Sequence, residues 1–209
     1  MKIIDTSSNT KKDVCCIAQQ GIEIIFRYYD TTTSWKVITA AEAQAISDAG
    51  MQIGIVFEHG NCPTSFTEPN GFDHACCAFT YATETIKQPF NSAIYFAVDF
   101  DASEAVITKN IIPFFKGVQK AFNKLGNGGA TFKIGAYGCG ATINKLKKLG
   151  LCEYRWLSQS TSFNGTSEAK NKCEYELIQL PKFNLEVCSI GVDEDAMNPT
   201  VSDVGAFSL

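Results

Sequence analysis

The chain has 209 residues, of which 45% are hydrophobic and 19% are charged, and its formal net charge is −4. This length suits one domain with a sizeable core, and the hydrophobic share argues against a disordered chain. The acidic balance, without a long basic run, disfavours a nucleic-acid partner, and no apolar stretch approaches the roughly 20 residues of a membrane span.

The N-terminal residues and the cysteines both bear on the compartment of the protein. Residues 1–6 have the composition of a strand and show no apolar signal segment with a cleavage site. We therefore expect a protein that is cytoplasmic as synthesised, unless a leader has been removed or export follows a leaderless route.

The nine cysteines are an odd set with two adjacent pairs, a poor disulfide framework, so we expect most to be reduced, buried hydrophobic residues. Nothing in the sequence predicts an oligomeric state.

Short β-branched runs alternate with helical patterns along the chain. The predicted strands span 2–5, 22–28, 52–57, 93–99, 132–137, 153–157, 175–180 and a short segment near 189–193. The predicted helices span 13–20, 39–49, 72–86, 104–125 and 140–149. A capping box begins the second helix, with Thr39 as N-cap and Glu42 three residues later, and Gly50 follows its end.

These strands are nearly continuous hydrophobic runs, which is typical of a parallel sheet covered on both faces. Eight such strands alternating with helices predict a compact (β/α)8 TIM-type barrel that occupies residues 1–209 as one domain. The last third is less regular, because residues 158–174 have loop composition and no helix is visible between the last two strands. A doubly wound open sheet is the alternative architecture.

Polar residues close the predicted strands, and in a TIM barrel these ends meet at one rim, where active sites lie. The acids at such ends are Asp5, Glu58, Asp99, Asp101 and Asp193, and Arg27, Tyr137, Trp156 and Gln179 lie on or at the ends of other strands. Asp99 and Asp101 are two residues apart, so on a strand they would point to the same face. Paired carboxyl groups serve glycoside hydrolysis, although loop starts and helix caps explain any single Asp equally well.

An ordered series of segments gives the chain a specific resemblance. In chain order they are Ile4–Ser7, Phe26–Tyr29, Gly54–Glu58, Ile94–Asp101, Ile134–Gly138, Tyr154–Leu157, Gln179–Leu180 and Gly191–Asp193. Together they resemble the domain of unknown function 1906 family, also described as the glycoside-hydrolase-like domain, which is related to the lysozymes of glycoside hydrolase family 25. The resemblance extends over nearly the whole chain.

This resemblance implies a modified TIM barrel and a peptidoglycan-type substrate, cleaved at an N-acetylmuramyl β-1,4 bond. The family 25 acids correspond here to Asp5, to Asp99 with Asp101, and to Asp193. The family 25 pair ends in Glu, whereas this chain has Asp101, as the 1906 family does. The shorter side chain reduces the reach by roughly 1.5 Å, and a misplacement of about 1 Å can cost on the order of a hundredfold in rate.

We therefore expect a carboxylate mechanism that requires no metal or cofactor. Asp101 or Glu58 would protonate the glycosidic oxygen, Asp99 would stabilise the positive charge at the sugar carbon, and the substrate's acetamido oxygen would act as the nucleophile. Asp5 and Asp193 would orient the sugar. Arg27 would hold an acid ionised or bind a substrate carboxylate. Tyr137, Trp156 and Gln179 would contact sugar rings, although a plain core role fits the two aromatic residues as well.

Three other interpretations stay open. The first is a glycan-binding module that has lost its proton donor. The second is a metal site, from His59 with Cys62 or from His74 with Cys76 and Cys77, although neither spacing follows a known zinc motif. The third is a nucleophilic cysteine at position 139, which would need a histidine that nothing in the sequence places beside it.

Overall fold

The computed structural model describes residues 1–32, 34–182 and 185–209 of the chain. Its strands are β1 Lys2–Asp5, β2 Ile22–Tyr29, β3 Gln52–Phe57, β4 Ala93–Ala97, β5 Lys133–Gly138, β6 Tyr154–Leu157, β7 Leu177–Gln179, β8 Leu185–Val187 and β9 Ile190–Met197. Strands β1 to β7 pair in chain order and parallel, and β9 closes the ring by pairing antiparallel with both β7 and β1. The predicted TIM-type barrel is confirmed, and the open-sheet alternative is wrong.

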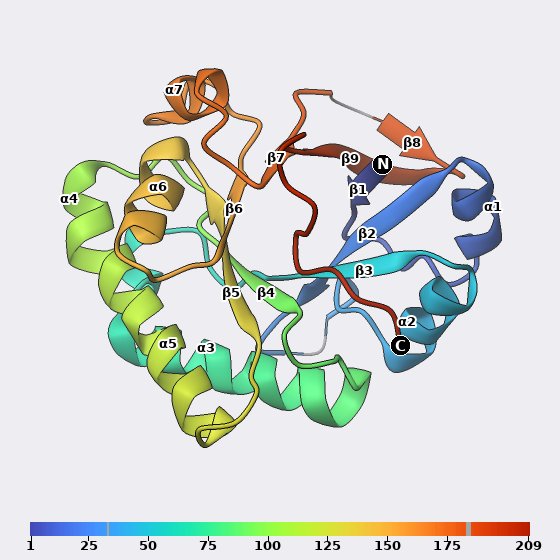
Figure 1. Cartoon of the computed structure of the whole chain (residues 1–209), viewed down its shortest axis with the longest axis horizontal. Helices are drawn as coiled ribbons and strands as arrows, with labels where there is room; N and C mark the ends of the chain where they lie inside the picture. The colour runs from blue at the N-terminus through green and yellow to red at the C-terminus, as the bar shows by residue number, and fades with distance from the viewer. Residues whose placement is uncertain (33, 183–184) are drawn as a thin grey trace.

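Helices lie around the outside of this barrel (Figure 1). They are α1 Val14–Gln19, α2 Ala40–Asp48, α3 Glu68–Thr80, α4 Glu104–Val106, α5 Ile112–Gly126, α6 Gly140–Lys148 and α7 Thr166–Asn171, and a short 3-10 turn spans Pro63–Ser65. Wide π-helical turns extend α3 over Tyr81–Ile86 and join α4 to α5 over Ile107–Ile111. The second turn ends two residues before Pro113, which has no N–H for a regular helical bond. Within the described ranges, none of the helices has the length and apolar character needed to cross a membrane.

Both faces of the sheet are apolar, as the continuous hydrophobic runs predict. Phe26, Tyr95 and Trp156 pack together inside the barrel, with ring centroids 4.7 to 5.8 Å apart. Residues next to them in sequence, such as Ile25 and Phe96, point outward and pack under the helices. The strict two-residue alternation therefore decides which side chains can reach the inside of the barrel.

The predicted cap of α2 is confirmed in part. The hydroxyl of Thr39 accepts a hydrogen bond from the backbone N–H of Glu42 at 3.2 Å, and Gly50 follows the helix with φ +80°. The carboxylate of Glu42, however, does not return to the Thr39 backbone as in a capping box. It is fully buried and binds Arg27 and Thr10 instead.

The last part of the chain departs from the expected order. Residues 158–174, expected as loop, contain α7. The eighth barrel strand is longer than the predicted segment near 189–193 and runs antiparallel, because β8 and β9 form a hairpin whose outer strand reverses the chain direction. The absence of a helix between the last two barrel strands is confirmed for the described residues, where β8 stands in its place.

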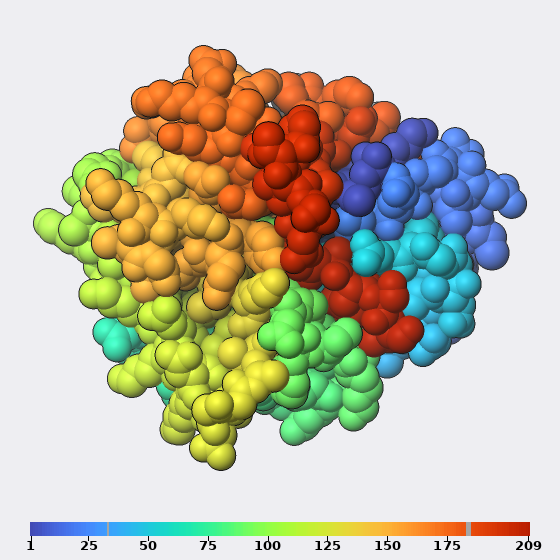
Figure 2. Space-filling model, in the orientation of Figure 1, coloured from blue at the N-terminus to red at the C-terminus, as the bar shows by residue number. Residues whose placement is uncertain are grey.

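The C-terminal segment closes the amino end of the barrel. The hydroxyl of Tyr95 donates to the backbone oxygen of Val204 at 2.8 Å, and Ile53 and Phe207 exchange backbone hydrogen bonds of 2.7 and 3.0 Å. This segment, coloured red, crosses the middle of the face shown in Figure 2. The carboxyl end of the barrel is then the side on which a cavity can open.

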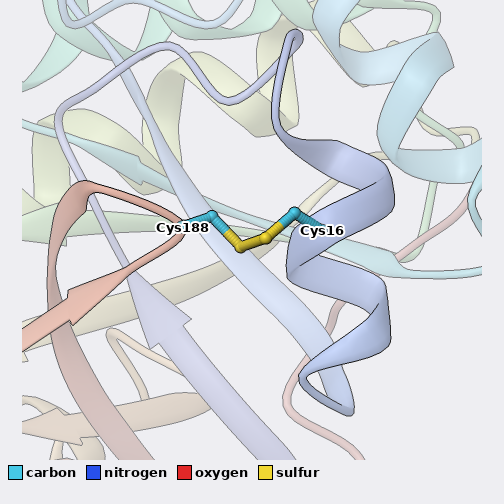
Figure 3. Close-up of a disulfide and its surroundings, with 2 residues drawn as sticks. All are labelled: Cys16 and Cys188. Atoms are coloured by element: carbon cyan, nitrogen blue, oxygen red, sulfur yellow. A yellow bond between two sulfur atoms is a disulfide. The ribbon is translucent and has the colours of Figure 1, made fainter.

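One disulfide joins Cys16 on α1 to Cys188 in the β8–β9 turn (Figure 3). The other seven cysteines are free, so the expectation that most are reduced is confirmed. The expectation that they are buried is wrong for four of them: Cys15, Cys62, Cys77 and Cys173 are exposed. In the adjacent pairs on helices, successive residues point about 100° apart, so both members cannot face the core.

Candidate active site

A cavity of about 310 Å³ opens at the carboxyl end of the barrel, opposite the C-terminal segment. Seven of the nine predicted site residues line it: Asp5, Glu58, Asp99, Tyr137, Trp156, Gln179 and Asp193. Tyr28, Val56, Ala97, Gln159 and Ser160 complete the lining. Sequence reasoning placed most of the acids here because each of them ends, or directly follows, a strand whose inner face is known from the alternation.

The register of the strands brings these side chains to one level. Asp5 on β1 lies directly opposite Asp193 on the antiparallel strand β9. Tyr137 on β5 lies beside Trp156 on β6. Trp156 also packs against Phe26 and Tyr95, so the acidic layer formed by these carboxyl groups rests directly on the aromatic core of the barrel.

Asp5 is the most deeply enclosed acid of the cavity wall. Only 2% of its surface is exposed, its Oδ2 accepts from the amide of Gln179 at 2.8 Å, and its Oδ1 accepts from the Tyr28 hydroxyl at 3.4 Å. Tyr137 donates in turn to the amide oxygen of Gln179 at 3.0 Å. Burial raises the pKa of Asp5 to about 7, with the Asp193 charge adding to the rise and the Gln179 hydrogen bond opposing it.

Asp195, which the sequence reasoning did not select, lies beneath this wall. Its Oδ1 accepts from the indole nitrogen of Trp156 at 2.9 Å, and its Oδ2 is buried without a hydrogen-bond partner among the described residues. Burial raises its pKa well above the usual range, and the neighbouring Asp5 charge adds to this. The sequence could have indicated Asp195 by its spacing, because it follows Asp193 by two residues and therefore lies on the same face of the strand.

Glu58 and Asp99 line the mouth of the cavity. The ammonium of Lys36 lies 2.9 Å from Oε2 of Glu58 and opposes its negative charge. The pKa of Asp99 is raised, first because its carboxylate loses hydration against the cavity wall and second because Glu58 repels its charge, while the Tyr137 hydroxyl acts in the opposite direction. Burial also raises the pKa of Asp193. The cavity therefore contains carboxyl groups in different electrostatic surroundings, as acid–base chemistry requires.

Asp101 does not join this group. Strand β4 ends at Ala97, so Asp99 and Asp101 lie in the following loop, where the two-residue alternation no longer holds. Asp101 is exposed, and its Oδ1 accepts from the backbone N–H of Asn164 at 2.7 Å. The expected side-by-side pair is therefore wrong, and Asp101 has a structural contact instead.

Arg27 is also absent from the cavity. It lies between Phe26 and Tyr28 on β2, and the alternation turns its side chain to the outer face, where it is fully buried. Its Nε donates to Oε1 of Glu42 at 2.8 Å, and its Nη1 donates to the backbone oxygen of Thr6. It does hold an acid, as expected in one of its two roles, but that acid belongs to α2 and not to the site.

The alternative metal and cysteine sites find no geometric support. His74 is buried against Phe57 and Phe114, and this burial lowers its pKa to about 4. No group of three or more His, Cys, Asp or Glu side chains in the described parts of the chain is placed to hold a metal. Cys139 is fully buried at the start of α6, in contact with Thr142, and does not line the cavity.

Comparison with curated proteins finds two relatives from Bacillus subtilis (strain 168). The uncharacterized protein YbfG is 30% identical over 160 residues, which are 74% of this chain and 22% of YbfG. The uncharacterized protein FadG is 29% identical over 181 residues, which are 78% of this chain and 31% of FadG. The chain thus spans less than a third of the length of the curated relatives it matches.

Solved structures share the fold. The Mycobacterium tuberculosis Tat-secreted protein Rv2525c, in complex with L-tartrate, has a TM-score of 0.77 at 19% identity, with 98% of each chain covered. A Streptomyces coelicolor lysozyme has a TM-score of 0.57 at 11% identity, covering 95% of this chain and 92% of that one. The Streptococcus pneumoniae autolysin LytC, in complex with a synthetic peptidoglycan ligand, has a TM-score of 0.56 at 12% identity, covering 93% and 46%.

A family model also matches most of the chain. The family described as "Rv2525c-like, glycoside hydrolase-like domain" matches residues 15–193, which contain β2 to β8, the start of β9 and most of the residues that line the cavity. This chain therefore belongs to the Rv2525c-like family of glycoside hydrolase-like domains.

Proposed function

We propose that this protein is a glycoside hydrolase that acts on peptidoglycan-type glycans, with N-acetylmuramidase-like specificity. The observation that carries the proposal is the cavity at the carboxyl end of the barrel, into which Asp5, Glu58, Asp99 and Asp193 converge from four strand ends. The shared fold with a lysozyme and with LytC, whose structure contains a peptidoglycan ligand, agrees with this substrate class.

Asp99 is the best candidate for the proton donor. It lies at the solvent-accessible mouth, and its raised pKa favours the protonated form that a general acid needs. Glu58, beside Lys36, is then the negative charge that stabilises the developing oxocarbenium ion. The sequence predicted the opposite roles, with Asp101 or Glu58 as the proton donor and Asp99 as the stabilising charge. Asp101 cannot be the donor here because it does not line the cavity. The substrate's acetamido oxygen would be the nucleophile, as in substrate-assisted glycosidases.

The disulfide supports a place of action outside the reducing cytosol. Bonds such as Cys16–Cys188 persist in oxidising compartments and are rare in the reducing cytosol. A cell-wall substrate also lies outside the cytoplasm. We therefore expect the folded protein to act there, after export.

The proposal is tested with purified cell-wall sacculi. Wild type and Asp101→Asn should both release reducing ends, because Asp101 does not line the cavity. Asp99→Asn should lose activity by at least about a hundredfold, the usual contribution of a general acid. Equal release by wild type and Asp99→Asn would remove Asp99 from the mechanism.

A second candidate function is a glycan-binding module without hydrolysis. It is favoured by one observation, the absence of Asp101 from the cavity, which leaves no close Asp-x-Asp pair. In that case wild type would sediment with sacculi but would release no reducing ends, and Asp101→Glu would not create activity because its side chain starts from the wrong place.

A further inference from the structure

Lys36, in the loop between β2 and α2, contacts two residues of the cavity wall without lining the cavity itself. Its ammonium lies 2.9 Å from Oε2 of Glu58 and donates to the backbone oxygen of the same residue at 3.4 Å. The ammonium also lies 5.5 Å from the centre of the Tyr28 ring, which is within the range of a cation–π contact. Glu58 and Tyr28 line the cavity, whereas Lys36 is not among its lining residues. Lys36 therefore reaches the site through its neighbours.

The backbone on both sides of this contact is fixed at the carboxyl ends of β2 and β3. Val37, next to Lys36, forms a parallel bridge with Tyr28 on β2. The N–H of Glu58 donates to the backbone oxygen of Tyr29 at 3.2 Å, which continues the pairing of β3 with β2 beyond the last residue of β3. The Lys36 side chain thus connects two segments that are each held against the same strand.

Two carboxylates lie near this ammonium, and Glu58 is the nearer one. Oδ2 of Asp30 is 3.8 Å from Nζ of Lys36, compared with 2.9 Å for Oε2 of Glu58. The other oxygen of Asp30 is already in contact with the ring of His59 at 2.7 Å and accepts from the N–H of Thr31 at 2.6 Å. The Lys36 and Glu58 side chains are only 21% and 29% exposed, so solvent screens this pair less than a fully exposed one. Glu58 is therefore the acid whose charge Lys36 opposes most directly.

Glu58 carries the effect of Lys36 to Asp99. Burial and the charge of Glu58 raise the pKa of Asp99, and the Tyr137 hydroxyl acts in the opposite direction. A cation beside Glu58 reduces the repulsion that Asp99 experiences. The two contacts of Lys36, to the carboxylate and to the backbone oxygen of Glu58, also restrict the rotation of that side chain. Placement matters here, because a shift of about 1 Å in a reacting group can cost on the order of a hundredfold in rate.

We propose that Lys36 is a positioning residue of the site, which fixes the Glu58 carboxylate in the cavity wall and balances the negative charge that Asp99 faces, without touching the glycan. This inference rests on the proposed function, because it assumes that Asp99 and Glu58 act on a glycosidic bond. It adds a residue outside the cavity on which the difference between the two acids depends.

Carbon NMR titration of Asp99, in the protein without glycan, tests the electrostatic part. Lys36→Met keeps an unbranched side chain and removes the charge, so Asp99 should titrate at higher pH than in wild type. Glu58→Gln should move the titration to lower pH. The Lys36→Met/Glu58→Gln double variant should titrate as Glu58→Gln does, because Lys36 acts through Glu58. A shift by Lys36→Met that is equally large with Gln at position 58, or no shift at all, would overturn this coupling.

Kinetics on soluble, uncrosslinked peptidoglycan chains test the positioning. Lys36→Met, shown to be folded by circular dichroism, should lower kcat about tenfold and change KM by less than about twofold, because Lys36 does not touch the glycan. The basic limb of its pH–rate profile should move to higher pH. Lys36→Arg keeps the charge and should restore most of kcat. Lys116→Met, on the exposed face of α5, is the matched control and should behave as wild type does.

The outcomes separate this inference from the proposed function. If wild type cleaves the chains and folded Lys36→Met has the same kcat and pH–rate profile, the positioning role is wrong and the proposed function stands. If Lys36→Arg is as impaired as Lys36→Met, the charge at this position is not what matters and the inference is wrong. If wild type releases no reducing ends, the proposed function fails and the positioning role fails with it, whereas the titrations still decide whether Lys36 acts on Asp99 through Glu58.

Discussion

Trp156 donates from its indole nitrogen to Oδ1 of Asp195 across 2.9 Å, at the floor of the acidic cavity. The second oxygen of this carboxyl group is buried without a partner in the described chain, and Asp5 is its acidic neighbour. Two buried carboxyl groups this close cannot both ionise at low cost, so the pair holds a proton near neutral pH. A carboxyl pair that holds a proton therefore lies beneath the other acids that line the cavity.

Asp195→Asn should remove most of this coupling. The amide keeps an oxygen for Trp156 and places an N–H toward Asp5, which lowers the pKa of Asp5 from about 7. In wild type the folded pKa of Asp5 is above the unfolded value, so the contribution of Asp5 to folding stability is fully present below pH ~4 and is lost as the pH rises to about 7. The variant should show a weaker fall, and should gain stability over wild type mainly above neutral pH.

Urea unfolding at several pH values between about 4 and about 8 measures this difference. The exposed Asp48→Asn is the matched control, since it changes the same charge on the surface of α2. Stability curves of wild type and Asp195→Asn that run parallel over the whole range would contradict the shared proton.

Glu58→Gln should lower the pKa of Asp99. Glu58 is the main neighbouring charge that raises this pKa, and the amide removes the repulsion while keeping the shape. If Asp99 is the general acid, the basic limb of the pH–rate profile should move to lower pH in the variant. Carbon NMR of the Asp99 carboxyl gives the pKa directly, with the exposed Glu84→Gln as control. An unchanged Asp99 titration would rule out the coupling.

Much of the site could be predicted because its signals are local. Asp5, Glu58 and Asp193 end or extend inner-face positions of their strands, so the alternation and the barrel topology together place them. The prediction that Asp101 lies in the site was wrong because β4 ends four residues before it. Its hydrogen-bond partner, Asn164, is distant in sequence. No local pattern reports where a strand stops pairing.

The predictions for Arg27 and for the cysteines were wrong for different reasons. Arg27 lies between two inner-facing residues, so the same alternation that placed the acids should have turned it outward. The Cys16–Cys188 bond joins residues 172 positions apart, and it depends on the hairpin that brings β9 back beside β1. The pairing depends on contacts between distant parts of the chain, so no local spacing in the sequence predicts it.

Arg27→Met should destabilise the fold, although Arg27 does not line the cavity. It leaves the fully buried Glu42 carboxylate without its cation, which typically costs about 3–5 kcal/mol. Glu168→Ala, which removes an exposed pair with Lys172, should leave stability nearly unchanged. Denaturant unfolding measures both variants. A loss for Arg27→Met as small as that of the surface control would show that the buried pair does not matter.

Gly135→Ala should test whether the aromatic core supports the cavity from below. A Cβ at Gly135 would lie 2.3 Å from the ring of Tyr95, which is fully buried and cannot move away easily because its hydroxyl is bonded to Val204 and its ring packs edge-on against Trp156. Overpacking of this kind typically costs about 1–3 kcal/mol.

The matched control is Gly191→Ala, where the added methyl group meets nothing within 4 Å and should leave stability nearly unchanged. Because Trp156 also binds Asp195, a shift of the Tyr95 ring in Gly135→Ala should be transmitted to the acidic floor and alter the titration of Asp5, even in molecules that remain folded. Thermal unfolding and carbon NMR of Asp5 separate the two effects. Lower stability with an unchanged Asp5 titration would mean that the core and the acidic layer are mechanically independent.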